Sequence, residues 1–92
     1  MRNLIVTTKF KKSLKKVSKY KTFKQEVFDE IVMMLRLDII IPEKYKDHSL
    51  SGDLKNIRDL HLAPDIVLLY SKDKDKLFLY LVNIGSHSEL FK

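Results

Sequence analysis

The chain of 92 residues contains no cysteine, which excludes disulfides and thiolate chemistry and fits a reducing compartment. No apolar run is long enough to cross a bilayer. Lysines follow soon after Val6, so no signal peptide is expected at the start. Repeats, linkers and low-complexity segments are also missing. We therefore expect one domain, residues 1–92, with a modest core, in the cytoplasm and with no membrane partner.

Acidic residues are missing from the first 25 positions, which carry nine basic residues. The formal net charge of +6 is therefore unevenly placed, because residues 26–92 hold nine basic residues against all twelve acids. A lysine-rich segment attracts polyanions over long distances and indicates a nucleic acid as partner. The alternative interpretation of this segment is a solvated lysine face.

The first third of the sequence predicts one strand and two helices. Leu4–Val6 is a short apolar strand, and Thr7 or Thr8 can cap the helix that follows. Apolar residues then recur at helical spacing in two stretches, separated by a turn near Lys21. The two stripes consist of Phe10, Leu14, Val17 and Tyr20, and of Phe23, Val27, Ile31 and Met34 or Leu35.

The second half predicts three consecutive strands at residues 56–62, 65–71 and 77–84, after a segment, 38–53, that is mostly loop. A tail with one helical turn follows. The fold class is then α+β, in the order β-α-α-β-β-β, with a helical hairpin on one face of a mainly antiparallel sheet. In the first of the three strands, Leu60 and Leu62 share one face while Asp59 and His61 share the other. If the helices cover the leucines, His61 points to the open face.

All three histidines lie in this second half, each beside Asp or Ser: His48 in the loop, His61 in a strand and His87 just past the last strand. Imidazole is the side chain best suited to exchanging protons at neutral pH. A meander brings strand ends and loops together, so the three can converge. The chain is thus a candidate acid–base catalyst on an anionic substrate. Taken singly, each is also explained as an ordinary loop, sheet or tail histidine.

Three separated motifs, Tyr45–Gly52, Ile57–Asp65 and Ile84–Phe91, resemble the YafQ-type toxins of the RelE superfamily, which are toxin halves of bacterial type II toxin–antitoxin pairs. The resemblance spans nearly the whole chain, including the helical hairpin. It implies a RelE-like fold and an endoribonuclease that cuts messenger RNA, typically on the ribosome. We expect this activity to need no cofactor and no metal. The resemblance also implies a cognate antitoxin that binds and neutralises the toxin.

The resemblance places the catalytic positions at His48, His61, Asp65 and His87. We expect His87 to transfer a proton, as the acid rather than the base, with His48 or Asp65 as the base and His61 orienting a partner or the phosphate. Such a set meets the needs of metal-free RNA cleavage, in which a base takes the 2′-hydroxyl proton and an acid protonates the leaving 5′ oxygen.

Four further positions are expected to bind the RNA. Lys46 and Arg58 are candidate phosphate contacts, and Phe91 is the base-contacting position that the resemblance implies. Arg58 is alternatively the ion-pair partner of Asp47 or Asp59. The fourth position, Asn83, departs from the pattern of the family, which often has arginine there. Asn83 can donate a hydrogen bond to phosphate but carries no charge.

Three other functions remain open. A non-enzymatic toxin resembling the ParE branch would act on DNA gyrase. A plain basic RNA-binding module would use the lysine-rich first helix, which is also a candidate contact for ribosomal RNA. A zinc site built from the histidines and Asp65 is less favoured, because the sequence has no compact ligand pair such as HxxxH.

Overall fold

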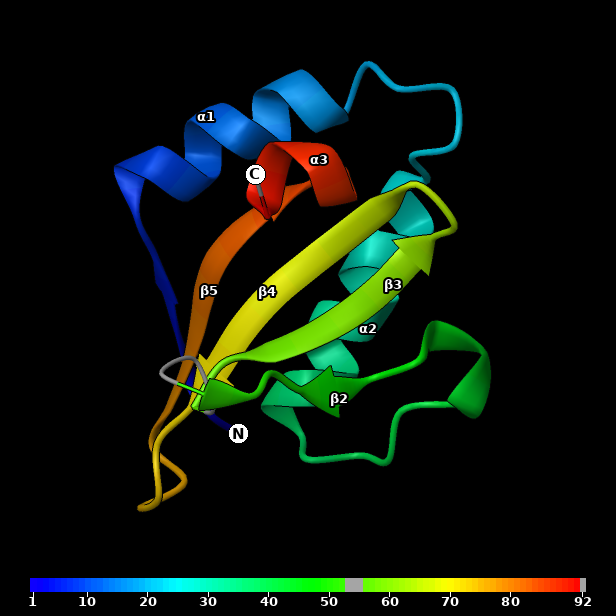
Figure 1. The fold of residues 1–92 in the computed structure, drawn as a ribbon. Coiled ribbons are helices and arrows are strands. Elements are labelled where there is room, and N and C mark those ends of the chain that lie inside the picture. The colour runs from blue at the N-terminus through cyan, green and yellow to red at the C-terminus, as the bar shows by residue number, and fades with distance from the viewer. Residues whose placement is uncertain (53–55, 92) are drawn as a thin grey trace.

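The computed structural model describes residues 1–52 and 56–91. Its elements are β1 (Asn3–Val6), α1 (Thr8–Val17), α2 (Gln25–Arg36), η1 (Glu43–Tyr45), β2 (His48–Ser49), β3 (Arg58–Ala63), β4 (Ile66–Lys72), β5 (Phe78–Gly85) and α3 (His87–Leu90). Five strands form one sheet in the order β1-β5-β4-β3-β2 (Figure 1). The β1–β5 pair is parallel and the other pairs are antiparallel. The predicted α+β class with a mainly antiparallel sheet is confirmed.

The first helix begins where the sequence predicts. Thr7 has an extended backbone, and its hydroxyl oxygen accepts a hydrogen bond from the amide of Phe10 at 3.0 Å. This cap satisfies one of the backbone donors that a helix leaves free at its start. Phe10 and Val17 are the buried residues of α1, and lysines occupy its other side, so the helix is strongly amphipathic.

The second helix begins later than predicted. Lys24 is its N-cap, so Phe23 lies in the connection before α2 instead of on the helix. Phe23 still packs against the core, with its ring centroid 6.1 Å from that of Phe28. The ring of Phe28 in turn lies 6.4 Å from that of Phe10 on α1. A hydrophobic stripe therefore identified a core residue correctly but not its secondary structure.

The core lies between the helices and one face of the sheet. Leu60 on β3 is fully buried there, whereas Asp59 and His61 alternate with it and project to the other face. In Figure 1 this second face is turned toward the viewer, and α2 lies behind it. The sheet residues of the core are Leu60, Ile66, Leu68, Tyr70, Leu79, Leu81 and Ile84.

Residues 38–53 are less irregular than expected. The short helix η1 and the two-residue strand β2 interrupt this loop, and β2 adds a fifth strand at the edge of β3. Two residues are too few to show a periodicity. The predicted turn at 51–53 lies partly outside the described residues.

No helix of the described part combines the length and the apolar character that crossing a bilayer requires.

Candidate functional site

A carboxylate and two imidazoles meet on the open face of the sheet. Nε2 of His61 lies 3.3 Å from Oδ1 of Asp59, within ion-pair distance. The ring centroids of His61 and His87 are 5.4 Å apart. Asp59 is only 2% exposed, and its Oδ1 receives no hydrogen bond from any residue that the structure describes. A buried carboxylate oxygen without a hydrogen bond is available to accept one from the neighbouring imidazole.

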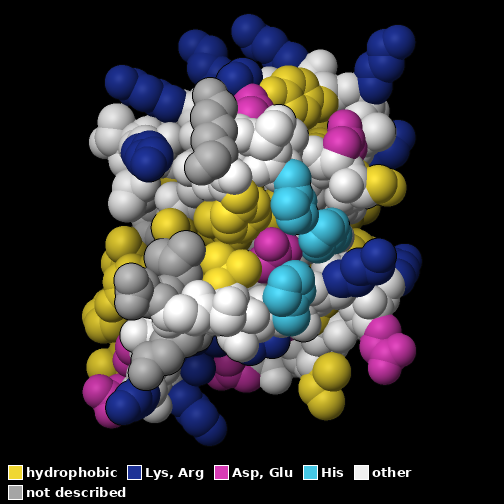
Figure 2. Space-filling model, in the orientation of Figure 1, with side chains coloured by type: hydrophobic (Ala, Val, Ile, Leu, Met, Phe, Trp, Pro, Cys, Tyr) yellow, Lys and Arg dark blue, Asp and Glu magenta, His cyan; other side chains and the backbone are white. Residues whose placement is uncertain are grey.

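His48 joins this face from the edge strand. It lies directly opposite Asp59 in the β2–β3 pairing, and residues opposite each other in an antiparallel pair project to the same side. Figure 2 shows the three histidines of the chain gathered on this face. The structure thus brings together the three imidazoles that the meander suggested would converge.

The tautomer of His48 follows from its hydrogen bond. Nδ1 lies 2.6 Å from the backbone carbonyl oxygen of Lys46. Because a carbonyl can only accept, Nδ1 must carry the proton, and the neutral ring then has its lone pair on Nε2. Since the side chain is exposed, this nitrogen is available as a proton acceptor.

His87 is the first residue of the short helix α3, and an ion pair between Glu89 and Lys16 connects α3 to α1. The hydroxyl of Ser86 and the carboxylate of Glu89 form a capping box at its start. Glu89 also accepts hydrogen bonds from Lys16 at 2.6 Å and from the Tyr20 hydroxyl at 2.9 Å. The ammonium of Lys16, together with the Ser86 amide and Tyr20, lowers the pKa of Glu89 to about 2. This carboxylate therefore sets the position from which His87 projects.

Replacing Glu89 with glutamine should remove part of the acid sensitivity of the fold. A depressed pKa stabilises the folded state above the ordinary value of 4.5, and the contribution is lost as the pH falls toward about 2. The free energy of unfolding of the native protein, measured with urea between pH 7 and pH 2.5, should therefore fall more steeply below pH 4.5 than that of Glu89→Gln. The exposed Glu26→Gln serves as control, and identical slopes for native protein and Glu89→Gln would contradict the prediction.

Asp65 is not part of the cluster that Asp59 forms with the imidazoles in the described part of the chain. It is exposed on the turn between β3 and β4, and its Oδ1 accepts a hydrogen bond from the Thr22 hydroxyl at 2.6 Å. Among the described residues, the atoms of Asp59, His61 and His87 all lie within 4.8 Å of one another. The carboxylate at the centre is thus Asp59, for which the sequence predicted a place on the face of His61 and a candidate ion pair with Arg58 but no catalytic role. The alternation that put Asp59 and His61 on one face was the signal that could have found it.

The three described residues predicted to contact phosphate lie in different parts of the structure, and of these only Lys46 lines a hollow together with a histidine. Nε of Arg58 is 3.0 Å from Oδ1 of Asp47, so of its two candidate partners Asp47 is the one that it contacts. Lys46 is exposed and lines one hollow together with His61. Asn83 lines another hollow, next to α1 and α3, and its side-chain oxygen accepts a hydrogen bond from the amide of Ile84 at 2.9 Å.

Phe91, the predicted base contact, lies beside His87. The ring of Phe91 is 37% exposed, and its centroid lies 5.2 Å from that of His87. A base stacked on this ring would carry its phosphodiester toward His87. The carboxylate and two imidazoles are also a donor set that suits zinc or copper. The zinc site that the sequence suggested contained Asp65, whereas the carboxylate of the set in the structure is Asp59.

Comparisons with known proteins identify relatives of this chain. The family described as bacterial toxin of type II toxin–antitoxin system, YafQ, matches residues 2–92. The mRNA interferase toxin YafQ of Escherichia coli K12 is 39% identical over 61 residues, which are 66% of this chain and 64% of the relative. The aligned part thus spans slightly less than two thirds of that relative.

Solved structures match over the full fold. A metal-bound toxin from Helicobacter pylori is 41% identical, with a TM-score of 0.88 over 99% of this chain and 100% of that one. In the E. coli DinJ–YafQ toxin–antitoxin complex, the matching chain is 27% identical, with a TM-score of 0.84 over 99% of this chain and 98% of that one. The match of sequence over residues 2–92, together with the shared fold, shows that the chain belongs to the YafQ family of bacterial type II toxin–antitoxin toxins.

Proposed function

We propose that the protein is an mRNA interferase, an endoribonuclease that cuts messenger RNA with the 2′-hydroxyl as nucleophile and without a metal ion. The observation that carries the proposal is the group of three imidazoles on one sheet face, two of them beside a buried carboxylate. The name of the E. coli relative, mRNA interferase toxin, supports the same activity. A ribonuclease needs a proton acceptor and a proton donor on either side of one phosphodiester, and this face supplies both.

In the proposed reaction, His48 is the base. Its Nε2 accepts the 2′-hydroxyl proton, and the 2′ oxygen attacks the phosphorus. As the bond to the 5′ oxygen breaks, His87 gives that oxygen a proton, which leaves a 2′,3′-cyclic phosphate and a 5′-hydroxyl end. Asp65 is the alternative base, although its Oδ1 already accepts a hydrogen bond from the Thr22 hydroxyl. Each proton transfer is typically worth a factor of about 10² to 10⁴ in rate.

His61 has a different task in this proposal. Its imidazolium, balanced by Asp59 at 3.3 Å, donates to the phosphate oxygens as negative charge accumulates on them. Preorganised donors of this kind stabilise the transition state because they need no rearrangement during the reaction. Lys46 adds positive charge to the same side of the site.

The direct test is to map cuts on translated messages by primer extension and to analyse the chemistry of the ends. We expect 2′,3′-cyclic phosphate and 5′-hydroxyl products, and unchanged cleavage with phenanthroline, which removes zinc and copper but leaves magnesium for the ribosome. Cleavage that stops with phenanthroline would contradict the metal-free mechanism. Intact messages together with DNA damage would favour the gyrase-directed alternative.

We also infer that the messenger is cut on the ribosome, with the lysines of α1 contacting ribosomal RNA. In Figure 2, basic side chains gather at the end of the molecule where Figure 1 shows α1. A cognate antitoxin is the second proposed partner, since the E. coli relative of known structure is held in a toxin–antitoxin complex. Co-purification with the product of a small neighbouring gene would test this partner.

The double change Lys11→Gln and Lys12→Gln on the exposed side of α1 should weaken binding to RNA and its dependence on salt. Each lost phosphate contact reduces the slope of log K against log salt by about 0.7 for single-stranded RNA, so a decrease of about 1.4 is expected. Fluorescence anisotropy between about 50 and 300 mM salt measures this slope. Because a slope difference of this size changes the affinity roughly tenfold over that range, the protein concentrations are adjusted at each salt concentration. The matched control is Lys74→Gln with Lys76→Gln at the exposed β4–β5 turn, and equal slopes for both doubles would refute the role of α1.

A further inference from the structure

The strand that carries His48 is held to the sheet by very little backbone pairing. In the described part of the chain, β2 has two residues, His48 and Ser49, both exposed, and its partner is β3 at the sheet edge. One further backbone hydrogen bond, from the Leu50 amide to the Ile57 carbonyl at 2.9 Å, continues this pairing. Just before them, Lys46 adopts a left-handed conformation with φ 51°, which is unfavourable for a residue with a side chain. Something besides the β2 ladder must fix this peptide if His48 is to keep a defined position.

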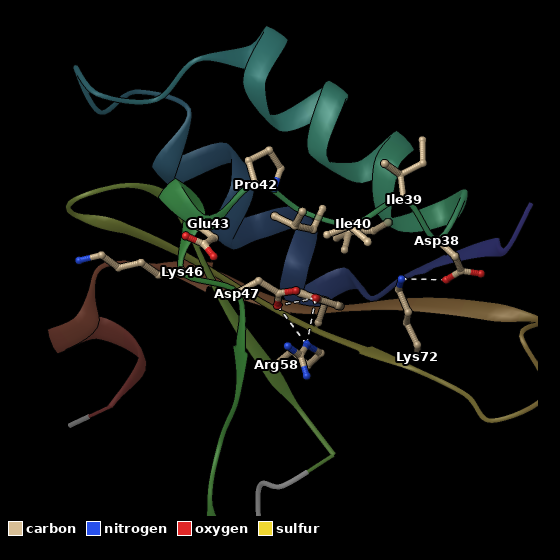
Figure 3. A pocket seen from close by; sticks show the side chains of 12 residues that line it. Asp38, Ile39, Ile40, Pro42, Glu43, Lys46, Asp47, Arg58 and Lys72 are labelled. Atoms are coloured by element: carbon tan, nitrogen blue, oxygen red, sulfur yellow. Dashed lines mark hydrogen bonds and ion pairs between the residues drawn. The ribbon is translucent and has the colours of Figure 1, made fainter.

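The side chain of Asp47 supplies that anchor. Its Oδ1 accepts a hydrogen bond from the Tyr70 hydroxyl at 2.6 Å and another from Nε of Arg58 at 3.0 Å. The Arg58 nitrogen also lies 3.2 Å from the Tyr70 oxygen, so the three groups close a triangle. Figure 3 shows Asp47 and Arg58 facing each other, with η1 and the 38–43 segment around the same hollow of about 500 Å³.

Tyr70 is the fixed point of this triangle. It is 1% exposed and belongs to the core, and it lies opposite Arg58 in the β3–β4 pairing. Burial and the neighbouring carboxylate strongly raise the pKa of its hydroxyl, which therefore keeps its proton and remains a donor to Asp47. The network thus connects the rigid centre of the sheet with the loop at its edge.

Asp47 and His48 are consecutive, and they point in opposite directions. Asp47 turns to the core side, where Tyr70 lies, and His48 turns to the open face with the other histidines. From this arrangement we propose that Tyr70, Asp47 and Arg58 are positioning residues that fix the location and the tautomer of the His48 imidazole. The inference rests on the proposed function, and it assigns Arg58 to His48 instead of to the phosphate.

The link to the tautomer runs through Lys46. The carbonyl oxygen that accepts from Nδ1 of His48 belongs to the residue directly before Asp47. When Asp47 is released, this carbonyl is free to turn, Nδ1 loses its acceptor, and the proton distributes between the two ring nitrogens. His48 would then present a protonated Nε2 for part of the time and could not accept the 2′-hydroxyl proton.

The test compares variants that each remove one hydroxyl group. Tyr70→Phe keeps the ring in the core but removes the donor to Asp47. The control, Tyr80→Phe, removes an exposed hydroxyl on the open face of the sheet, where Tyr80 pairs with β1 and β4 and not with β2 or β3. The primary measurement is the nitrogen-15 NMR spectrum of the His48 ring, which distinguishes the two tautomers without any RNA. We expect the Nδ1-protonated form in the native protein and in Tyr80→Phe, and a mixture of both forms in Tyr70→Phe.

The second measurement is single-turnover cleavage of a bound message. Tyr70→Phe should lower the maximal rate by about 10-fold to 100-fold, the cost of misplacing a catalytic group by a fraction of an ångström to one ångström. RNA affinity should stay unchanged, because Tyr70 is buried and does not reach the RNA. If Tyr70→Phe does not fold, Asp47→Ala, which removes the oxygen that accepts from Tyr70 and Arg58, is measured in its place with the same expected results.

The two readouts separate this inference from the proposed function. Ring signals of His48 that coincide in native protein and Tyr70→Phe would overturn the positioning role, whatever the enzyme cleaves. Loss of RNA affinity instead of rate in Arg58→Lys would also overturn it, because Arg58 would then be a phosphate contact. Absence of cleavage by the native protein would contradict the proposed function and would leave the NMR test of the positioning role decisive.

Discussion

Replacing His87 with alanine is expected to reduce the rate of mRNA cleavage by about 10² to 10⁴-fold. In the proposed reaction this imidazole donates the proton that the leaving 5′ oxygen needs, and a poor leaving group cannot depart without it. Folding should be unaffected, because His87 is exposed and α3 is held through Ser86 and Glu89 instead. The measurement is single-turnover cleavage of a translated message, with the free energy of unfolding determined in parallel.

The neighbouring variant Ser88→Ala, also exposed on α3, is the control and should cleave like the native protein. A substrate with sulfur in place of the 5′ oxygen sharpens the assignment, since a thiolate leaves without protonation. This substrate should restore most of the rate of His87→Ala but little of the rate of His48→Ala. Cleavage by His87→Ala at the native rate, or rescue of His48→Ala alone, would show that the acid has been misassigned.

The sequence was sufficient for those features that depend on regular periodicity. The alternation of Leu60 with Asp59 and His61 predicted which way His61 points, and the structure has it so. Thr7 was one of two candidate caps for α1, and it is the cap. Hydrophobic burial decides the first feature and a local hydrogen bond to the Phe10 amide decides the second. Both depend on residues that are near one another in the sequence, so the order of residues predicts them.

Features that depend on contacts between distant segments could not be predicted in this way. The pairing of His48 with Asp59 joins a two-residue strand to another element, and no pattern within β2 indicates it. The choice of Arg58 between Asp47 and Asp59 was decided by the hydroxyl of Tyr70, 12 residues away in the chain. The central carboxylate was missed for the same reason, since Asp59 becomes important only when α3 brings His87 to it.

Replacing Asp59 with leucine should make the fold more stable and the enzyme slower. The carboxylate is 2% exposed, and its Oδ1 makes no hydrogen bond to the described residues, although Nε2 of His61 lies 3.3 Å away. A buried polar group without a hydrogen bond costs about 1–3 kcal/mol. Leucine has a similar size and would lie beside Val67 and Leu69, which are buried and were not part of the main core cluster. The free energy of unfolding should therefore rise by an amount in this range.

Cleavage should fall because His61, the proposed donor to the phosphate, would lose the carboxylate that lies 3.3 Å from its Nε2. We expect a decrease of about 10-fold to 100-fold in single-turnover rate, as for other misplaced catalytic groups. Asp59→Asn, which keeps the shape, should show the same loss of activity, and the exposed Asp75→Leu should change neither quantity. A variant at position 59 that is less stable and cleaves normally would mean that this carboxylate serves the fold. A variant at position 59 that is more stable and cleaves slowly would mean that the protein keeps a destabilising charge in its sheet because RNA cleavage requires it.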